Sequence, residues 1–306
     1  MKNKPELAIF GLGRMGGQIA RRLHVKGFPV YAWNRSPEPV EEFNSFGGSA
    51  TSDIAQAVGK LKSKERIFWV MLPQGIVDDF LFGADHLAPH LRAGDIVIDG
   101  GNSLYKESMK RGERLAKLGV HFFDCGTSGG VWGEKNGFAL MVGGPKEKWG
   151  AIEPIIEALS AGDNFAYLGK CGAGHFTKMV HNGIEYGMME AIGEGYAVLE
   201  ASDFDLDLAA VTRVYQKGSV VRSWLIDLVR NIFEHEDVAG TSGKIDATGE
   251  GEWTVQAGKE LGVDVRVIED ALKVRSESKD PKNQDKFSNK IVALLRKQFG
   301  GHAIHK

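Results

Sequence analysis

The segment from Lys178 to Tyr186, with the sequence KMVHNGIEY, places four chemically capable side chains at helical spacing. On a helix with about 100° per residue, Asn182 lies about 40° and Glu185 about 20° from the direction of Lys178. His181 lies about 60° from the same direction. A base, an amide, a carboxylate and an imidazole would therefore share one side of a helix. The alternative is an ordinary solvated Lys/Glu face, and the surrounding motifs decide between the two.

A dinucleotide-binding motif stands near the N-terminus. The apolar run at residues 7–10 leads into a glycine-rich turn, and residues 18–27 then read as a helix. Strand, turn and helix in this order are the context that a GxGxxG match requires. The first glycine permits a tight turn, the second lets the backbone approach a pyrophosphate, and the third allows close helix packing. The predicted cofactor-binding residues here are Gly11, Leu12, Gly13, Arg14, Met15 and Gly16.

The end of the second predicted strand, residues 29–33, indicates which dinucleotide binds. It is followed by Asn34, Arg35 and Ser36, where an NAD-specific site usually has an acidic residue for the ribose hydroxyls. A guanidinium beside small polar donors suits a 2′-phosphate, because it forms charge-assisted hydrogen bonds and can stack on adenine. We therefore predict NADP, with NAD as the second choice. In the alternative interpretation, Arg35 is only a solvated turn residue.

Further apolar runs continue the alternation of a doubly wound sheet, in which ligands bind beyond the carboxyl ends of the strands. The predicted strands are residues 66–72, 95–101, 121–126, 138–144 and 165–169. The residues that follow them are candidates for ligand contacts because they can donate and accept hydrogen bonds or expose backbone amides. These candidates are Met71, Leu72, Pro73, Asn102, Ser128, Gly129 and Gly130.

After residue 169 the periodicity becomes helical to the end of the chain. The predicted helices are residues 174–202, 206–217, 219–234, 251–261, 264–275 and 283–299. We therefore predict an α/β fold, with an N-terminal Rossmann-type doubly wound sheet followed by an all-helical C-terminal domain. The expected domains are residues 1–165, which bind NADP, and residues 166–306, which bind substrate and form the dimer.

Composition limits the classes of function. The chain has 306 residues, a net charge of -2 and a pI near 6.5, so nothing suggests a nucleic-acid or membrane partner. Its two cysteines, Cys125 and Cys171, lack metal-ligand spacing and are too few for a disulfide framework. No metal site is expected. Since no signal peptide or membrane span is evident, we expect a cytoplasmic enzyme.

Five motifs together resemble decarboxylating 6-phosphogluconate dehydrogenase, over nearly the whole chain. They are IFGLGRMG, IDGGNS at 98–103, SGG at 128–130, GHFTKMVHNGIEYG at 174–187 and FGGH at 299–302. The length is similar to that of the short bacterial branch. The resemblance implies a homodimer or homotetramer in which the C-terminal tail of one subunit completes the site of its neighbour.

The resemblance also implies the reaction and the roles of residues. The reaction would be oxidative decarboxylation of 6-phosphogluconate to ribulose 5-phosphate and CO2 with reduction of NADP, as in the pentose phosphate pathway and gluconate utilization. Neutral Lys178 would remove the 3-hydroxyl proton and then, protonated, support the enediol, while Glu185 would protonate carbon 1. The residues that would contact the sugar acid are Asn102, Ser128, Gly129, Gly130, His181 and Asn182. Tyr186 and Arg275 would bind its phosphate, and Arg296 and His302 would reach the neighbouring subunit's phosphate site. For the cofactor, the resemblance covers Gly11 to Gly16, Asn34 to Ser36, Met71 to Pro73, and Asn102 as well.

One position departs from the family pattern. Where the family has Gly-Lys/Arg-Trp-Thr, with a cation on the substrate phosphate, this chain has Gly251-Glu252-Trp253-Thr254. A carboxylate near a phosphate dianion repels it by more than ~1 kcal/mol unless it is screened or turned away. Lys259 could substitute for the missing cation.

Two other functions stay open: a β-hydroxyacid dehydrogenase for a small acid such as 3-hydroxyisobutyrate, and a noncatalytic NADP-binding sensor.

Overall fold

The computed structural model describes residues 4–246 and 249–305. The chain divides into two compact units, Met1–Lys178 (unit 1) and Met179–Lys306 (unit 2). The division falls inside helix α8 (Ala173–Glu200), which contributes residues to both units. The sequence predicted a division at residue 165, but that position lies inside strand β8 (Ser160–Gly169), whose backbone pairs with β7.

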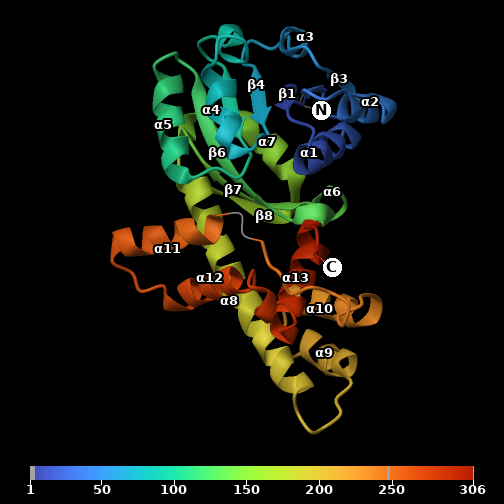
Figure 1. The fold of residues 1–306 in the computed structure, drawn as a ribbon. Coiled ribbons are helices and arrows are strands. Elements are labelled where there is room, and N and C mark those ends of the chain that lie inside the picture. Colours follow the sequence, from blue (N-terminus) through green and yellow to red (C-terminus); the bar gives the residue numbers. More distant parts are fainter. Residues whose placement is uncertain (1–3, 247–248, 306) are drawn as a thin grey trace. The chain divides into compact units, whose positions relative to one another are not determined.

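Unit 1 contains one sheet of eight strands in the order β3-β2-β1-β4-β5-β6-β7-β8 (Figure 1). Neighbouring strands are parallel except for β6 and β7, which are antiparallel. Besides β8, the strands are β1 (Leu7–Phe10), β2 (Val30–Trp33), β3 (Ser49–Thr51), β4 (Ile67–Val70), β5 (Ile96–Asp99), β6 (His121–Ser128) and β7 (Phe138–Gly143). The predicted Rossmann-type sheet is confirmed. The short strand β3 was not predicted, and β8 begins earlier than expected.

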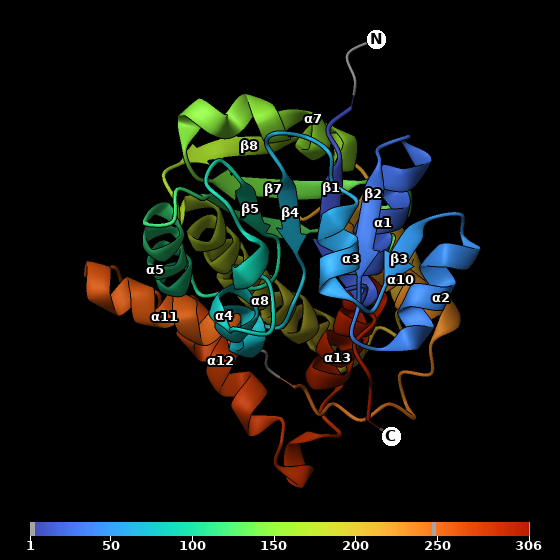
Figure 2. The ribbon, with the colours of Figure 1, turned by 90° about the horizontal axis from the view of Figure 1, so that it is seen from above.

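Helices cover both faces of this sheet (Figures 1 and 2). Strand β1 is buried on both sides: Leu7 and Ile9 join a core with α1, α2 and α7, while Ala8 and Phe10 join a core with α3, α4 and α5. This alternation explains why the strand reads as a continuous apolar run. The helices are α1 (Arg14–Val25), α2 (Pro37–Ser45), α3 (Ile54–Gly59), α4 (Gln74–Phe82), α5 (Tyr105–Ala116), α6 (Gly133–Asn136) and α7 (Trp149–Leu159).

The described residues of unit 2 form helices and connecting loops without strands, as predicted. After α8, its helices are α9 (Leu208–Gln216), α10 (Trp224–His235), α11 (Glu250–Leu261), α12 (Arg266–Glu277) and α13 (Phe287–Gly300). Helix α10 begins later than the sequence predicted, because Ser223 caps its first turn by accepting a hydrogen bond from the Ile226 amide.

Helix α13 lies in the core of unit 2. Its residues 291–295 are all buried, and they pack with buried residues of α8, α9, α10 and α12. A helix that is apolar around most of its circumference is buried on most sides, which explains the run IVALL. None of the described helices combines the length and hydropathy that crossing a membrane requires.

Candidate functional site

The glycine loop after β1 has the geometry of a dinucleotide site. Gly11 has φ +101°, and a Cβ added to it would lie 2.4 Å from the Met71 carbonyl oxygen. A Cβ on Gly16 would lie 1.9 Å from the Gly11 oxygen, so α1 approaches the loop as closely as the sequence predicted. A Cβ on Gly13, by contrast, would meet no heavy atom within 4 Å. The backbone is open at the position where a pyrophosphate would approach, and these residues therefore fit a dinucleotide.

The loop after β2 is held against the glycine loop by one side chain. The Leu12 amide donates to Asn34 Oδ1 at 3.0 Å, and Asn34 Nδ2 donates to the Ser36 carbonyl at 3.1 Å. Asn34 therefore organises the loop. Arg35 is exposed, and no carboxylate of the described residues forms an ion pair with it. Its guanidinium remains available to an anion at the end of β2.

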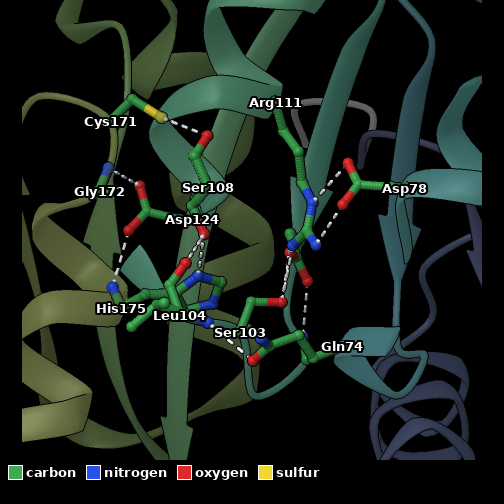
Figure 3. A network of polar contacts seen from close by, with 12 residues as sticks. Gln74, Asp78, Ser103, Leu104, Ser108, Arg111, Asp124, Cys171, Gly172 and His175 are labelled. Carbon is green, nitrogen blue, oxygen red and sulfur yellow. Dashed lines mark hydrogen bonds and ion pairs between the residues drawn. The ribbon is translucent and has the colours of Figure 1, made fainter. Parts of the chain in front are cut away.

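The loop after β5, which includes Ser103 and Leu104 (Figure 3), is fixed on both sides of Asn102. Asn102 itself is exposed. Buried Asp99 accepts hydrogen bonds from the Gly101 amide at 3.1 Å and from Ser103 Oγ at 2.9 Å. Arg111, also buried, donates to both Asp99 and Ser103 at 3.0 Å. Asn102 is thus presented from a backbone that buried charged groups hold in place.

The same network reaches the loop after β4 (Figure 3). Gln74 Oε1 accepts a hydrogen bond from the Leu104 amide at 3.0 Å, and Arg111 pairs with Asp78 of α4 at 3.1 Å. Residues Met71 to Pro73 lie just before α4. The loops after β4 and β5, both of which the sequence predicted as candidates for ligand contacts, are therefore joined by hydrogen bonds and an ion pair.

Strand β6 ends in a third predicted loop. Ser128 is its last residue, and Gly129 and Gly130 have φ +142° and +52°. A Cβ on Gly129 would lie 3.1 Å from the Phe138 ring, so a larger residue would be strained in both conformation and space. Since β1, β2, β4 and β5 are parallel to β6, all five strands end at one edge of the sheet.

The N-terminus of α8 is fixed by groups that the sequence analysis missed (Figure 3). Buried Asp124 accepts hydrogen bonds from the Gly172 and His175 amides, both at 2.7 Å. The carboxylate therefore caps the helix and complements its dipole. His175 is buried as well, and its Nδ1 lies 2.7 Å from Ser108 Oγ. A charged residue within the apolar strand HFFDCG was the sequence signal for Asp124.

Lys178 lies one turn into α8 and packs closely on the sheet. A Cβ on Gly126 of β6 would lie 2.4 Å from the Lys178 Cβ, and a Cβ on Gly174 would lie 2.4 Å from the Met141 oxygen. Both glycines are needed for the helix to approach β6 and β7. The first side-chain carbons of Lys178 consequently pack against the backbone of β6.

The other three residues of the KMVHNGIEY segment belong to unit 2. His181 Nδ1 lies 3.0 Å from Asn182 Oδ1 and 3.8 Å from Glu185 Oε2. The imidazole, amide and carboxylate thus form one cluster on α8, as the helical spacing predicted. Helix α11 packs here as well: Thr254 Oγ1 donates to the Met179 carbonyl at 2.7 Å, and a Cβ on Gly183 would meet the Thr254 side chain.

Unit 2 also contains a buried cationic cluster. The Arg275 Cζ lies 3.3 Å from the centre of the Tyr186 ring, and Arg275 Nε lies 3.4 Å from Glu190 Oε1. Arg275 is 1% exposed and Arg296 is 6% exposed. Burial, and then the charge of Arg275, lower the pKa of Arg296. Arg275 Nη1 has no hydrogen-bond partner among the described residues. Two buried guanidiniums and one unsatisfied buried donor have the chemistry that could hold an anion.

Arg296 is buried within reach of the charge of Arg275 of its own chain, and the contact with a neighbouring subunit that the sequence analysis expected of it stays a prediction. The tail also packs on its own unit: the Ser242 amide donates to the His305 carbonyl, and His305 Nε2 lies 3.0 Å from Asp246 Oδ2. The ring of His302 packs edge-on against Phe299. A contact of this tail with another subunit stays a prediction.

Glu252 lies in the first turn of α11 and is exposed. The preceding residue, Gly251, packs so closely that a Cβ on it would lie 2.7 Å from the Tyr186 ring. Glu252 therefore directly follows a residue that packs on Tyr186, the ring on which Arg275 stacks. Lys259, the possible substitute cation, forms an exposed ion pair with Glu269 at 2.8 Å.

The two cysteines are free thiols and are not activated. Burial raises the pKa of Cys125, and it raises the pKa of Cys171 to about 12. A thiol with a raised pKa is a poor nucleophile and a poor metal ligand at neutral pH. Within residues 4–246 and 249–305, no group of His, Cys, Asp or Glu has the arrangement of a metal site.

Comparison with known proteins covers both units. Residues 6–172 match the NAD binding domain of 6-phosphogluconate dehydrogenase, and residues 174–303 match the 6-phosphogluconate dehydrogenase C-terminal domain. An NAD(+)-dependent, decarboxylating 6-phosphogluconate dehydrogenase of Haloferax volcanii is 38% identical over 98% of this chain and 98% of its own length. An NADP(+)-dependent, decarboxylating enzyme of Bacillus subtilis is 35% identical over 89% of this chain, which spans 61% of that longer protein.

A solved structure gives the same result. The 6-phosphogluconate dehydrogenase of Plasmodium falciparum has a TM-score of 0.82 and 29% identity, over 90% of this chain and 62% of that protein. Structures of that enzyme include its apo form and its complexes with NADP+ and with 6-phosphogluconate.

Proposed function

The chain belongs to the 6-phosphogluconate dehydrogenase family, and we propose that it oxidises and decarboxylates 6-phosphogluconate to ribulose 5-phosphate and CO2. The observation that carries the choice of substrate is the buried Arg275 and Arg296 pair with its unsatisfied donor. Two desolvated guanidiniums suit a phosphate dianion, because each can form charge-assisted hydrogen bonds with its oxygens. A small hydroxyacid without phosphate carries only its carboxylate, and has no second anionic group to place in this site.

Lys178 and Glu185 act in turn on the substrate. The nicotinamide supplies the hydride acceptor when it is bound. Lys178 removes the proton of the 3-hydroxyl group and later, as an ammonium group, stabilises the negative charge that develops on that oxygen as CO2 leaves. Glu185 then gives a proton to carbon 1. The rigid contact between Lys178 and Gly126 supports this role, since a base must be held within hydrogen-bond reach of its proton.

Further residues hold the sugar acid and its phosphate. Tyr186 packs against Arg275 and orients that guanidinium toward the phosphate. Asn102 is presented by the network around Asp99, which supports a fixed hydrogen bond to a substrate hydroxyl. The other residues that we assign to the sugar acid are Ser128, Gly129, Gly130, His181 and Asn182.

A substrate panel tests the proposal. The purified protein is mixed with NADP and, separately, with 6-phosphogluconate, gluconate or 3-hydroxyisobutyrate, and both reduced cofactor and CO2 are measured. We expect equal amounts of the two products with 6-phosphogluconate, and little of either with the other acids. Reduction of the cofactor without CO2 would favour a β-hydroxyacid dehydrogenase. No reduction with any acid, with either NADP or NAD, would favour a noncatalytic sensor.

We propose NADP as the preferred cofactor. Arg35 follows β2, is exposed and has no carboxylate partner among the described residues, which supports binding of a 2′-phosphate. The Arg35→Gln variant should raise KM for NADP by about tenfold or more, because a charged hydrogen bond is worth about 1.5–3 kcal/mol. The KM for NAD should stay the same, and it serves as the internal control. Equal changes for the two cofactors would show that Arg35 does not distinguish them.

A further inference from the structure

Glu190 is a buried carboxylate that the proposed reaction does not use. It is 5% exposed, lies on α8 one turn beyond Tyr186, and forms an ion pair of 3.4 Å with Arg275 Nε. The same guanidinium stacks on Tyr186 and has its Nη1 unsatisfied among the described residues. The carboxylate and an incoming phosphate would therefore share one guanidinium.

The charged groups around Glu190 come from three helices. Arg275 of α12 and Arg296 of α13 favour its charged form, whereas Glu194, one turn further along α8, opposes it. Burial has the largest effect, and together these groups raise the pKa of Glu190 to about 7. Arg296 also faces Glu185, Tyr186 and Asp246. The side chain can consequently gain a proton near neutral pH, when the charge around it changes.

We propose that Glu190 is an exchangeable counter-ion of the phosphate site, paired with Arg275 when the site is empty and protonated when a phosphate dianion is bound. This inference rests on the proposed function, because it takes Arg275 as a phosphate ligand. A carboxylate and a phosphate dianion close to one guanidinium repel each other, so binding of the dianion favours the protonated carboxyl group. The proton comes from solvent and forms an O–H bond on the carboxyl group, and no other covalent bond of the protein or ligand changes.

Binding of the substrate is then coupled to uptake of one proton. A sugar phosphate has its second pKa near 6, so above pH 7 the ligand is already a dianion. In that range the affinity follows the fraction of Glu190 that is protonated, and it should fall by about tenfold for each pH unit. Glu190 thus makes binding of the phosphate dianion weaken as the pH rises above 7.

Calorimetric titration of the full-length protein with 6-phosphogluconate, without cofactor, tests this coupling. At pH 8, titrations in two buffers of different ionisation enthalpy give the number of protons taken up. We expect close to one proton for the wild-type protein and none for Glu190→Gln. The affinity of the variant should be nearly constant from pH 7 to 8.5, where that of the wild-type protein falls. Glu200→Gln, which removes an exposed carboxylate at the C-terminal end of α8, is the matched control and should keep the wild-type pattern.

The outcomes separate this inference from the function on which it rests. Absence of proton uptake by the wild-type protein at pH 8 would overturn the inference, even if no variant folded. Unchanged proton uptake and pH dependence in Glu190→Gln would overturn it too. If instead Arg275→Gln binds 6-phosphogluconate as tightly as the wild-type protein, Arg275 is not a phosphate ligand, and the proposed function fails at that point.

Discussion

Glu252 is the residue at which this chain departs most clearly from the family pattern. It is exposed at the start of α11, directly after Gly251, which packs on the Tyr186 ring. A carboxylate at this position opposes the field of the buried arginines. Glu252→Arg should therefore lower KM for 6-phosphogluconate by about fivefold or more, since removing repulsion of about 1 kcal/mol has this effect.

Steady-state kinetics of Glu252→Arg at several ionic strengths measure the change in KM. Glu260→Arg, which makes the same charge change near the other end of α11, is the control and should leave KM unaltered. An unchanged KM in Glu252→Arg would mean that this side chain does not face the phosphate.

At the residue scale, the sequence was sufficient to predict the geometry of side chains that lie within one short segment. The cluster of His181, Asn182 and Glu185 follows from helical spacing, and the glycine loop follows from its pattern. Asp124 and Glu190 were missed because their partners lie elsewhere in the sequence. Periodicity cannot show which distant residue a buried charge will meet.

At the scale of elements, α8 depends on its N-terminal cap. Asp124→Asn keeps the size of the side chain but retains only one oxygen, so one of the two bonds to the Gly172 and His175 amides is lost. We expect the protein to lose about 1–2 kcal/mol of unfolding free energy, together with a lower kcat, because Lys178 lies one turn further along the helix.

Urea unfolding and steady-state kinetics measure these two effects. Asp207→Asn is the matched control, since Asp207 caps α9 by accepting a hydrogen bond from the Ala210 amide. That variant should lose a similar amount of stability while keeping its kcat. A normal kcat in Asp124→Asn would show that the cap does not position the catalytic lysine.

The elements themselves were largely predictable, because buried parallel strands and amphipathic helices have distinct patterns. The six helices predicted after residue 169 are all present. Their observed ends differ from the predicted ones where a capping residue such as Ser223 sets the first turn. Strand β3 was missed because its three residues, Ser49 to Thr51, are only half-buried and carry no apolar run. The boundary at residue 165 failed to match the compact units because β8 and the start of α8 both pack with the sheet.

At the scale of the whole molecule, the question is whether Arg296 serves its own chain. In the structure it is buried within reach of the charge of Arg275 of the same unit, and the tail that follows packs on residues 242–246. We therefore expect that a mixture of Lys178→Met and Arg296→Met proteins, unfolded together and refolded, stays inactive. Every active site would still lack one of the two groups.

If Arg296 acted on a neighbouring subunit, mixed dimers would contain one intact site. Roughly a quarter of wild-type activity would then return, because half of the dimers are mixed and half of their sites are complete. Recovery at that level would assign Arg296 to the partner's site. Refolded wild-type protein provides the reference activity.

The central claim is that Lys178 serves both oxidation and decarboxylation, and the most direct test is turnover by the Lys178→Met variant. Methionine keeps the apolar stem that packs on Gly126 but removes the amine. With 6-phosphogluconate and NADP, we predict neither reduced cofactor nor CO2, while the calorimetric affinity for NADP stays at the wild-type value. Substantial formation of both products by this variant would contradict the assignment of Lys178 as the base.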